Sequence, residues 1–194
     1  MESDAATLFP PLRIVLGTVI GLGITRVLMG VANLIQHPKR AALSSIHLLW
    51  AISMVVELIF FWWWQFALFQ ITEWTFGIFL FLTAYAVLLF LLSALLFPDR
   101  VDDYKGYEDF FLQRRHWFFG LFAITFVFDF IDTVIKGPEH FARIGAEYFV
   151  QVPAGLVLCL LAIWIGNRHF HHALVLAHLL YQTIWIVRLF HTVH

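Results

Sequence analysis

The stretch Gly23-Ile24-Thr25-Arg26-Val27-Leu28-Met29-Gly30 places a single arginine inside an apolar run that covers residues 12–35. About 20 apolar residues suffice to cross a bilayer as a helix, so the run predicts a transmembrane helix. An arginine at such depth costs about 2.5–3.5 kcal/mol on insertion scales, and its guanidinium keeps its proton at any ordinary pH. We therefore expect the rest of the chain to supply Arg26 with a partner or a water-filled cavity.

Small and polar side chains recur along this run at helical spacing. The residues that share one helix face are Gly23, Arg26, Gly30, Asn33 and His37. Gly17 and Gly21 form a G-x-x-x-G pattern on a neighbouring face. Because small residues let helices approach closely, we expect this helix to be surrounded by others.

The composition of the whole chain is typical of a membrane protein. Of its 194 residues, 61% are hydrophobic and only 13% are charged, whereas a soluble domain has roughly 25% charged residues. The formal net charge is −1, so there is no basic excess for binding a nucleic acid. The single cysteine, Cys159, excludes an intrachain disulfide and a cysteine metal cluster. The partner that the composition predicts is the lipid bilayer.

Apolar runs and the turns between them predict the architecture. The fold class is all-α, an integral membrane bundle of six transmembrane helices in a single domain covering residues 1–194. The predicted spans are 11–36, 42–69, 74–97, 110–135, 147–166 and 171–190. The one substantial loop is 98–106, and a Gly-Pro break follows at 137–140. A bundle of this kind is expected to form a homo-oligomer or to join a larger membrane complex.

Basic residues at the ends of the spans predict the orientation. Seven of them flank the turns after spans one, three and five: Lys39, Arg40, Arg100, Lys105, Arg114, Arg115 and Arg168. The opposite side holds four, namely Arg13, Lys136, Arg143 and Arg188. Since the more basic side tends to face the cytoplasm, both termini are predicted to lie outside the cell.

The second span offers a partner for Arg26. Its polar members His47 and Glu57 lie on one stripe of the helix, together with Trp50, Met54, Phe61 and Trp64. At 1.5 Å per residue, Arg26 lies about 16 Å and Glu57 about 20 Å from the same edge of the membrane. We therefore predict a buried Arg26–Glu57 pair. Such a pair either fixes how two helices align or belongs to a functional path.

Acidic residues in the fourth span suggest a second polar region. Asp129 and Asp132 are three residues apart and share a helix face, and Lys136 follows four residues after Asp132. By the predicted topology they lie near the outer end, level with Arg188. They form either an interfacial salt-bridge cluster or a vestibule that attracts cations toward Glu57.

Histidines are concentrated on the predicted inner side. His47, His116 and either His172 or His178 could converge there, because spans two, four and six all start on that side. Imidazole is a ligand for zinc, copper, iron and haem iron, so these residues are candidate metal ligands. No tight ligand motif is present, and the sequence identifies no cofactor.

Three segments carry a resemblance to known proteins. They are Gly21-Leu22-Gly23-Ile24-Thr25-Arg26, His47-Leu48-Leu49-Trp50 and Phe61-Trp62-Trp63. In the first two predicted spans, which contain these segments, the chain resembles a group of small bacterial inner-membrane proteins of unassigned function. The resemblance implies a location in the bacterial inner (plasma) membrane. It implies no activity and transfers no site residue.

Three functions follow from these observations. The leading one is an ion or proton channel, or a component of an ion-coupled transporter, with a polar track from Asp129 past Glu57 and Arg26 to His47. The track also includes Asn33, Asp132 and Arg188. The second is a haem- or metal-binding redox protein that uses the inner histidines. The third is a non-catalytic scaffold or interaction subunit in which the buried charges only orient helices. No G-x-S-x-G, H-E-x-x-H or phosphate-binding glycine loop occurs, and whether the protein is an enzyme is left open.

Overall fold

The computed structural model describes residues 4–37, 42–71, 74–99 and 101–192, and these residues contain helices and no strand. The helices are α1 (Asp4–Gln36), α2 (Ser45–Trp64), α3 (Phe76–Leu96), α4 (Tyr107–Lys136), α5 (Pro138–Ile144), α6 (Tyr148–Trp164) and α7 (Arg168–Thr192). A short 3₁₀ helix (Gln65–Gln70) continues α2. The predicted all-α membrane bundle is confirmed.

The described residues contain five or six candidate membrane spans. Five of their helices are long and apolar enough to cross a bilayer, and α5 with α6 makes a sixth candidate if the two are counted together. The two helices of this pair are bent by 75° at the break between them. The predicted fifth span, 147–166, thus corresponds to α6 alone, and the predicted break at 137–140 contains the start of the short helix α5.

Local sequence explains where several helices begin and end. Ser44 caps α2 by accepting a hydrogen bond from the backbone N–H of His47, and Thr75 caps α3 in the same way through Ile78. Gly137 ends α4 and Gly145 ends α5, with φ angles of 89° and 90° that side chains rarely tolerate. The two glycines therefore isolate α5 as a separate short helix.

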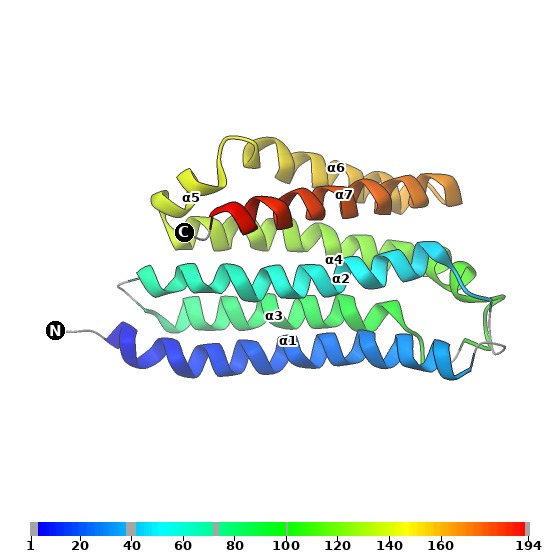
Figure 1. Cartoon of the computed structure of the whole chain (residues 1–194), viewed down its shortest axis with the longest axis horizontal. Helices are drawn as coiled ribbons and strands as arrows, with labels where there is room; N and C mark the ends of the chain where they lie inside the picture. Colours follow the sequence, from blue (N-terminus) through cyan, green and yellow to red (C-terminus); the bar gives the residue numbers. More distant parts are fainter. Residues whose placement is uncertain (1–3, 38–41, 72–73, 100, 193–194) are drawn as a thin grey trace.

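The long helices form two layers that face each other (Figure 1). One layer contains α1, α2 and α7, and the other contains α3, α4 and α6. At one edge α1 packs extensively on α3, and we call this contact the closed seam. At the other edge α6 and α7 scarcely touch, although only residues 165–167 connect them, and we call this the open seam. The bundle is therefore tight at one edge and divergent at the other.

Glycines of α1 permit the close approach at the closed seam. A Cβ added to Gly23 would contact Leu58 of α2 and the Ser93 hydroxyl of α3, each at 3.4 Å. A Cβ at Gly30 would overlap the ring of Phe97, just after α3. The opposite face of α1 is uncovered, with Met29 62% exposed. The prediction that this helix is surrounded by others is therefore wrong within one chain, since α1 lies at the edge of the bundle.

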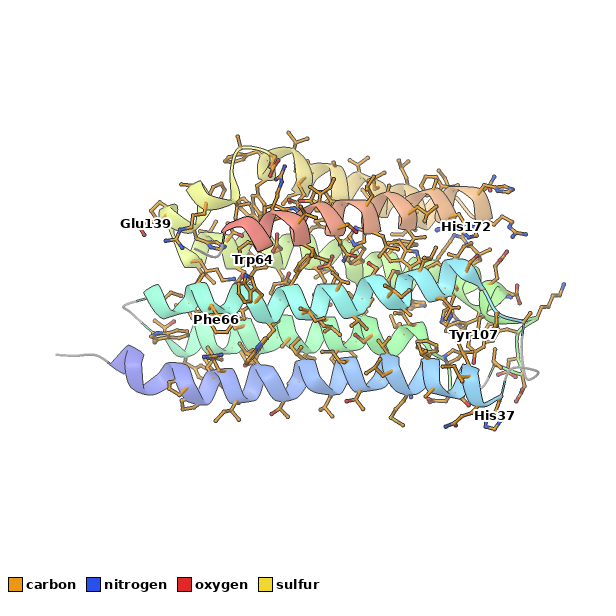
Figure 2. The ribbon with its side chains drawn as sticks, viewed as in Figure 1. His37, Trp64, Phe66, Tyr107, Glu139 and His172 are labelled. Atoms are coloured by element: carbon orange, nitrogen blue, oxygen red, sulfur yellow. The ribbon has the colours of Figure 1, made fainter. Side chains whose placement is uncertain are left out.

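The N- and C-termini lie at the same end of the bundle (Figure 1). We call this the terminal end, and the opposite end, which holds residues 97–99 and 101–106, the loop end. Figure 2 shows His37, Tyr107 and His172 at the loop end and Glu139 at the terminal end. Lys39, Arg40 and Arg100, which contributed to the predicted orientation, lie outside the described residues. Which end faces the cytoplasm stays a prediction.

Candidate functional site

Arg26 and Glu57 have different partners. The Arg26 guanidinium donates to the Asp99 carboxylate at 2.6 Å and to the Phe97 carbonyl oxygen at 3.0 Å. The Glu57 carboxylate lies 2.9 Å from the amide nitrogen of Gln182 and 3.2 Å from Nε2 of His178. The predicted Arg26–Glu57 pair is therefore wrong.

Arg26 and Glu57 do not pair because α3 ends beside Arg26 and because Glu57 lies on another face of α2. Arg26 lies level with the C-terminal end of α3, where unpaired carbonyls and the helix dipole favour a cation. Leu58 faces α1 at Gly23, whereas Glu57 lines a cavity bounded by α4, α6 and α7. Counting depth along α1 and α2 could not show that α3 ends beside Arg26.

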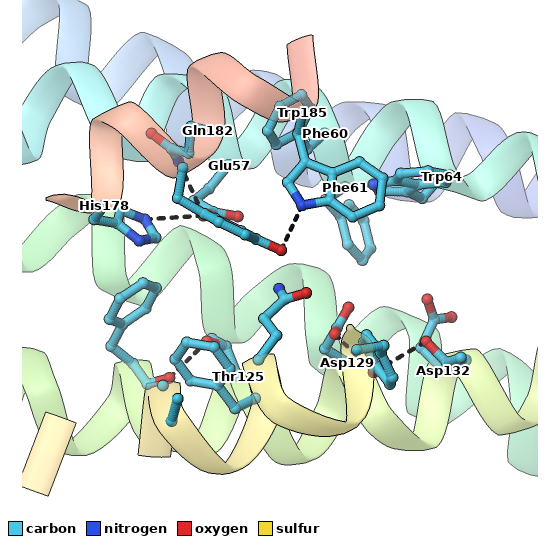
Figure 3. A pocket seen from close by; sticks show the side chains of 18 of the residues that line it. Glu57, Phe60, Phe61, Trp64, Thr125, Asp129, Asp132, His178, Gln182 and Trp185 are labelled. Atoms are coloured by element: carbon cyan, nitrogen blue, oxygen red, sulfur yellow. Dashed lines mark hydrogen bonds and ion pairs between the residues drawn. The ribbon is translucent and has the colours of Figure 1, made fainter. Parts of the chain in front are cut away.

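The cavity lies between the two layers where they diverge, and it extends from Trp50 and Leu174 to α5 at the terminal end. Its volume is about 650 Å³, which is within the range of small-molecule sites. Figure 3 shows Glu57, His178 and Gln182 on the side of α2 and α7, and Asp129 and Asp132 across the gap on α4. Residues on both sides of the break between α5 and α6 also line the cavity, namely Ile144, Glu147 and Tyr148.

Hydrogen bonds position Asp129 at this wall. Tyr148 donates its hydroxyl proton to the Asp129 carboxylate at 2.8 Å, and Thr133 donates to the Tyr148 oxygen at 3.1 Å. Asp129 and Asp132 lie on one face of α4, as their spacing predicts. Asp132 is instead bound to Lys136, and both side chains of this pair are buried.

Not every carboxylate around the cavity is paired with a lysine or arginine in the described part of the chain. Lys136 pairs with Asp132, and Arg188 pairs with Glu147 at the cavity wall. Within the described part of the chain, neither Glu57 nor Asp129 has a lysine or arginine at ion-pair distance. Their partners are an imidazole, an amide and a phenol. The site can thus bind a positive group or take up protons.

Aromatic side chains form much of the remaining wall. The rings of Trp64 and Trp185 lie 5.9 Å apart at 84°, and Trp185 donates its indole N–H to the hydroxyl of Tyr181. Phe60 and Phe61 lie beside them in Figure 3. The cavity therefore offers ring faces and carboxylates to the same space.

Several polar atoms that line the cavity are buried without a partner. Gln65 and Gln182 are each 2% exposed, and Asp132 is 4% exposed. Both polar atoms of the Gln65 amide, Oε1 of Gln182 and Oδ1 of Asp132 have no hydrogen-bond partner among the residues that the structure describes. A buried polar group without a partner costs about 1–3 kcal/mol. Such atoms point to a bound ligand or to water.

Toward the loop end the cavity stops at a cluster of rings. We call this cluster the aromatic plug; its members are Trp50, Phe111, Phe118, Phe119 and Phe122. All five are buried, and the ring of Trp50 lies 5.2 Å from that of Phe118 and 5.4 Å from that of Phe119. The plug separates the polar half of the bundle from the loop end.

The predicted polar track is therefore interrupted. Glu57, Asp129 and Asp132 lie together in the cavity, and Arg188 reaches its wall through Glu147. Three other members of the predicted track, Arg26, Asn33 and His47, do not line the cavity. The Asn33 side chain is exposed on α1. His47 donates from Nε2 to the Leu96 carbonyl at 2.5 Å, and its ring stacks on Tyr107.

The candidate metal ligands do not come together. His116 is exposed beside Trp117, His172 shares a hydrogen bond of 2.7 Å with the Ser45 hydroxyl, and His178 pairs with Glu57. In the described part of the chain, no group of three or more His, Cys, Asp or Glu side chains could hold a metal ion. The predicted convergence of His47 and His116 with His172 or His178 is wrong, because each ring has a different neighbour.

Sequence reasoning missed the partners of the two carboxylates. His178 and Gln182 are four residues apart on α7 and so share a face, which is a signal that the sequence does contain. Tyr148 and Gln65 follow no such spacing. Only the packing of α6 on α4 and the continuation of α2 as a 3₁₀ helix bring them to the cavity.

Comparison with known proteins gives no match, whether with family models, with curated proteins or with solved structures.

Proposed function

We propose that the protein is a proton-coupled carrier of a bacterial inner membrane, with both termini outside. One observation carries this proposal: a cavity of about 650 Å³ inside an apolar bundle contains Glu57 and Asp129 without a lysine or arginine partner among the described residues. Ionisable groups within membrane spans are rare, and they commonly mark the paths of protons and substrates.

The geometry favours a carrier over a channel. A channel needs a continuous path through the membrane, whereas the aromatic plug closes the cavity toward the loop end. A carrier needs a central site that is accessible from one side at a time. A cavity that the aromatic plug closes toward the loop end fits a carrier in the state that is accessible from the terminal end.

The cavity also has groups that can exchange a proton. The Glu57 carboxylate lies 3.2 Å from Nε2 of His178, so the two groups are close enough to pass a proton between them. The other ionisable groups that line the cavity are Asp129, Asp132, Lys136, His140, Glu147, Tyr85, Tyr148, Cys159 and Tyr181. A proton bound to Glu57 or Asp129 removes its charge and occupies one of its oxygens. Proton and substrate therefore compete for the same atoms, which couples their movements.

Helix α5 is suited to act as a gate. It lies between Gly137 and Gly145, both with positive φ, and contributes His140 and Ile144 to the cavity wall. Hinges that absorb backbone rotation at the ends of an element are common in gated sites. We propose that α5 opens and closes the terminal end of the cavity.

Transport in reconstituted vesicles tests this function. Proteoliposomes with a trapped pH-sensitive dye and an imposed pH gradient receive an aromatic amine, an aromatic alcohol or an aromatic carboxylate. We expect one class to accelerate the decay of the gradient with wild-type protein, relative to vesicles that carry Glu57→Gln. The matched control Asp99→Asn, which removes a carboxylate outside the cavity, should behave as wild type. If no class distinguishes wild type from Glu57→Gln, the carrier is excluded and the scaffold function is favoured.

A further inference from the structure

We propose that the transported solute is a lipophilic organic cation with ammonium N–H groups, and that it reaches the cavity sideways from the bilayer through the open seam. This inference rests on the proposed carrier function and adds its substrate class. It is based on the charge of the cavity, its unpartnered polar atoms, its aromatic walls and the separation of α6 from α7.

The charge of the cavity selects a cation. Lys136 and Arg188 are each bound to a carboxylate, and the Lys136 side chain is 0% exposed. Glu57 and Asp129 have only neutral or imidazole partners in the described part of the chain. An anion in this space would face both carboxylates, and the lysine of the wall, Lys136, is already bound to Asp132. A cation would be attracted by both.

The unpartnered lining atoms select hydrogen-bond donors on that cation. In the described part of the chain the acceptors without a partner include Gln65 Oε1, Gln182 Oε1 and Asp132 Oδ1, all on residues at most 4% exposed. An ammonium group supplies up to three N–H donors in one small volume. Among the described residues, donors such as Gln65 Nε2 and Trp50 Nε1 also have no partner, and they can be satisfied by water or by an oxygen of the solute.

The aromatic walls select an apolar body. The nearly perpendicular rings of Trp64 and Trp185 form a corner, and Tyr181 adjoins it through its bond to Trp185. Tryptophan and tyrosine faces attract cations electrostatically and pack against apolar groups. A solute with a charged head and an aromatic or alkyl body matches both parts of the cavity.

The open seam gives such a solute a route from the lipid. Ala154 and Leu158 of α6 and Ala177 of α7 line the cavity and are also exposed. Residues that do both mark an opening in the wall. Because α6 and α7 scarcely touch, this opening lies between them. An amphipathic amine concentrated in the bilayer could enter there without passing through water.

Binding of matched probes to the full chain in nanodiscs tests the inference. The probes are phenylbutylammonium, phenylbutanol and phenylbutanoate, measured by equilibrium dialysis in discs that contain no aminolipid. We expect the ammonium ion to bind at least tenfold more tightly than the alcohol or the carboxylate. A trimethylated analogue of the amine, which lacks N–H donors, should bind at least fivefold more weakly than the amine.

Paired variants locate the binding site. Glu57→Gln and Asp129→Asn should each weaken ammonium binding at least tenfold, whereas Asp99→Asn should leave it within twofold of wild type. Trp185→Leu should weaken it, and Trp117→Leu, which removes an exposed ring outside the cavity, should not. Ala177→Trp adds volume at the opening and should reduce binding without removing any contact. Circular dichroism confirms that each variant is folded before it is compared.

The outcomes separate this inference from the carrier function. Equal binding of the three probes, or equal loss in Asp99→Asn and Glu57→Gln, would overturn the substrate class. Loss of probe binding when phosphatidylethanolamine is added to the discs would assign the cavity to a lipid headgroup instead. Tight ammonium binding without proton movement in proteoliposomes would keep the site and overturn the carrier. Proton movement with the alcohol or the carboxylate alone would keep the carrier and overturn the cation.

Discussion

The two edges of the bundle, the closed seam and the open seam, consist of different kinds of residue. At the closed seam, α1 and α3 approach through Gly23 and Gly30, and an ion pair, Arg26–Asp99, lies at its end near the loop. At the open seam, α6 and α7 separate around carboxylates, amides and aromatic rings. Apolar packing with small residues makes a tight helix contact in a membrane, and buried polar groups require partners. We infer that the closed seam holds the bundle together and that the open seam carries its function.

The largest effect on stability is expected inside the cavity, at Lys136. Replacing Lys136 with Met leaves the buried Asp132 carboxylate without its cation, which commonly costs about 3–5 kcal/mol. The free energy of unfolding in mixed micelles should fall by this amount. The double variant Lys136→Met with Asp132→Leu should recover most of it, because no charge is then stranded. A double variant as unstable as the single one would show that the pair contributes nothing as a pair.

A substitution in the closed seam should have the next largest effect. Gly30→Leu places a side chain where the Phe97 ring lies, and overpacking of this kind costs about 1–3 kcal/mol. Gly21→Leu on the same helix is the matched control, because a Cβ at Gly21 meets nothing within 4 Å. Thermal unfolding should separate the two variants clearly. Equal melting temperatures would mean that α1 and α3 are not in contact as described.

The ion pair at the end of the closed seam should contribute little. Arg26 is 36% and Asp99 87% exposed, and exposed pairs are worth about 0–1 kcal/mol. Asp99→Asn should therefore change the free energy of unfolding by less than about 1 kcal/mol. A double-mutant cycle of Arg26→Leu with Glu57→Leu should show a coupling below about 0.5 kcal/mol, since the two residues share no partner. A coupling of several kcal/mol would restore the direct pair predicted from the sequence.

The smallest effect on stability is expected at the opening of the open seam. Ala177→Trp should change the free energy of unfolding by about 0.5 kcal/mol or less, because the residue is exposed and has space beside it. The same variant should lose ammonium binding. A large loss of stability would mean that α6 and α7 are packed against each other there.

Much of the fold could be predicted from the sequence, because apolar run length and turn residues act locally. The helical spans and the break near Gly137 follow from run length and turn residues, and the shared face of Asp129 and Asp132 follows from their spacing along one helix. Helix neighbours do not follow from such spacing. In lipid, one apolar face packs about as well as another, so hydropathy could not indicate that α1 lies beside α3 at the edge of the bundle.

The candidate site could be predicted only in part for the same reason, because spacing along one helix does not indicate which helices are neighbours. Glu57 and Asp129 could be identified as in-membrane carboxylates, but their partners come from three other helices and depend on how the layers diverge. The predicted Arg26–Glu57 pair is wrong because depth along α1 and α2 does not reveal the end of α3. Its partner Asp99 follows the end of α3 in a loop whose position the sequence does not fix.

Photoaffinity labelling tests the difference between the two seams most directly. A phenylbutylammonium probe that carries a diazirine is bound to the protein in nanodiscs and activated by light, and the labelled peptides are identified by mass spectrometry. We predict labels on cavity-lining residues of α2, α6 and α7, such as Trp64, Ala154 and Trp185, that disappear with excess unlabelled amine or in Glu57→Gln. Labels concentrated on α1 and α3, or labels on α6 and α7 that persist unchanged in Glu57→Gln, would contradict the assignment of function to the open seam.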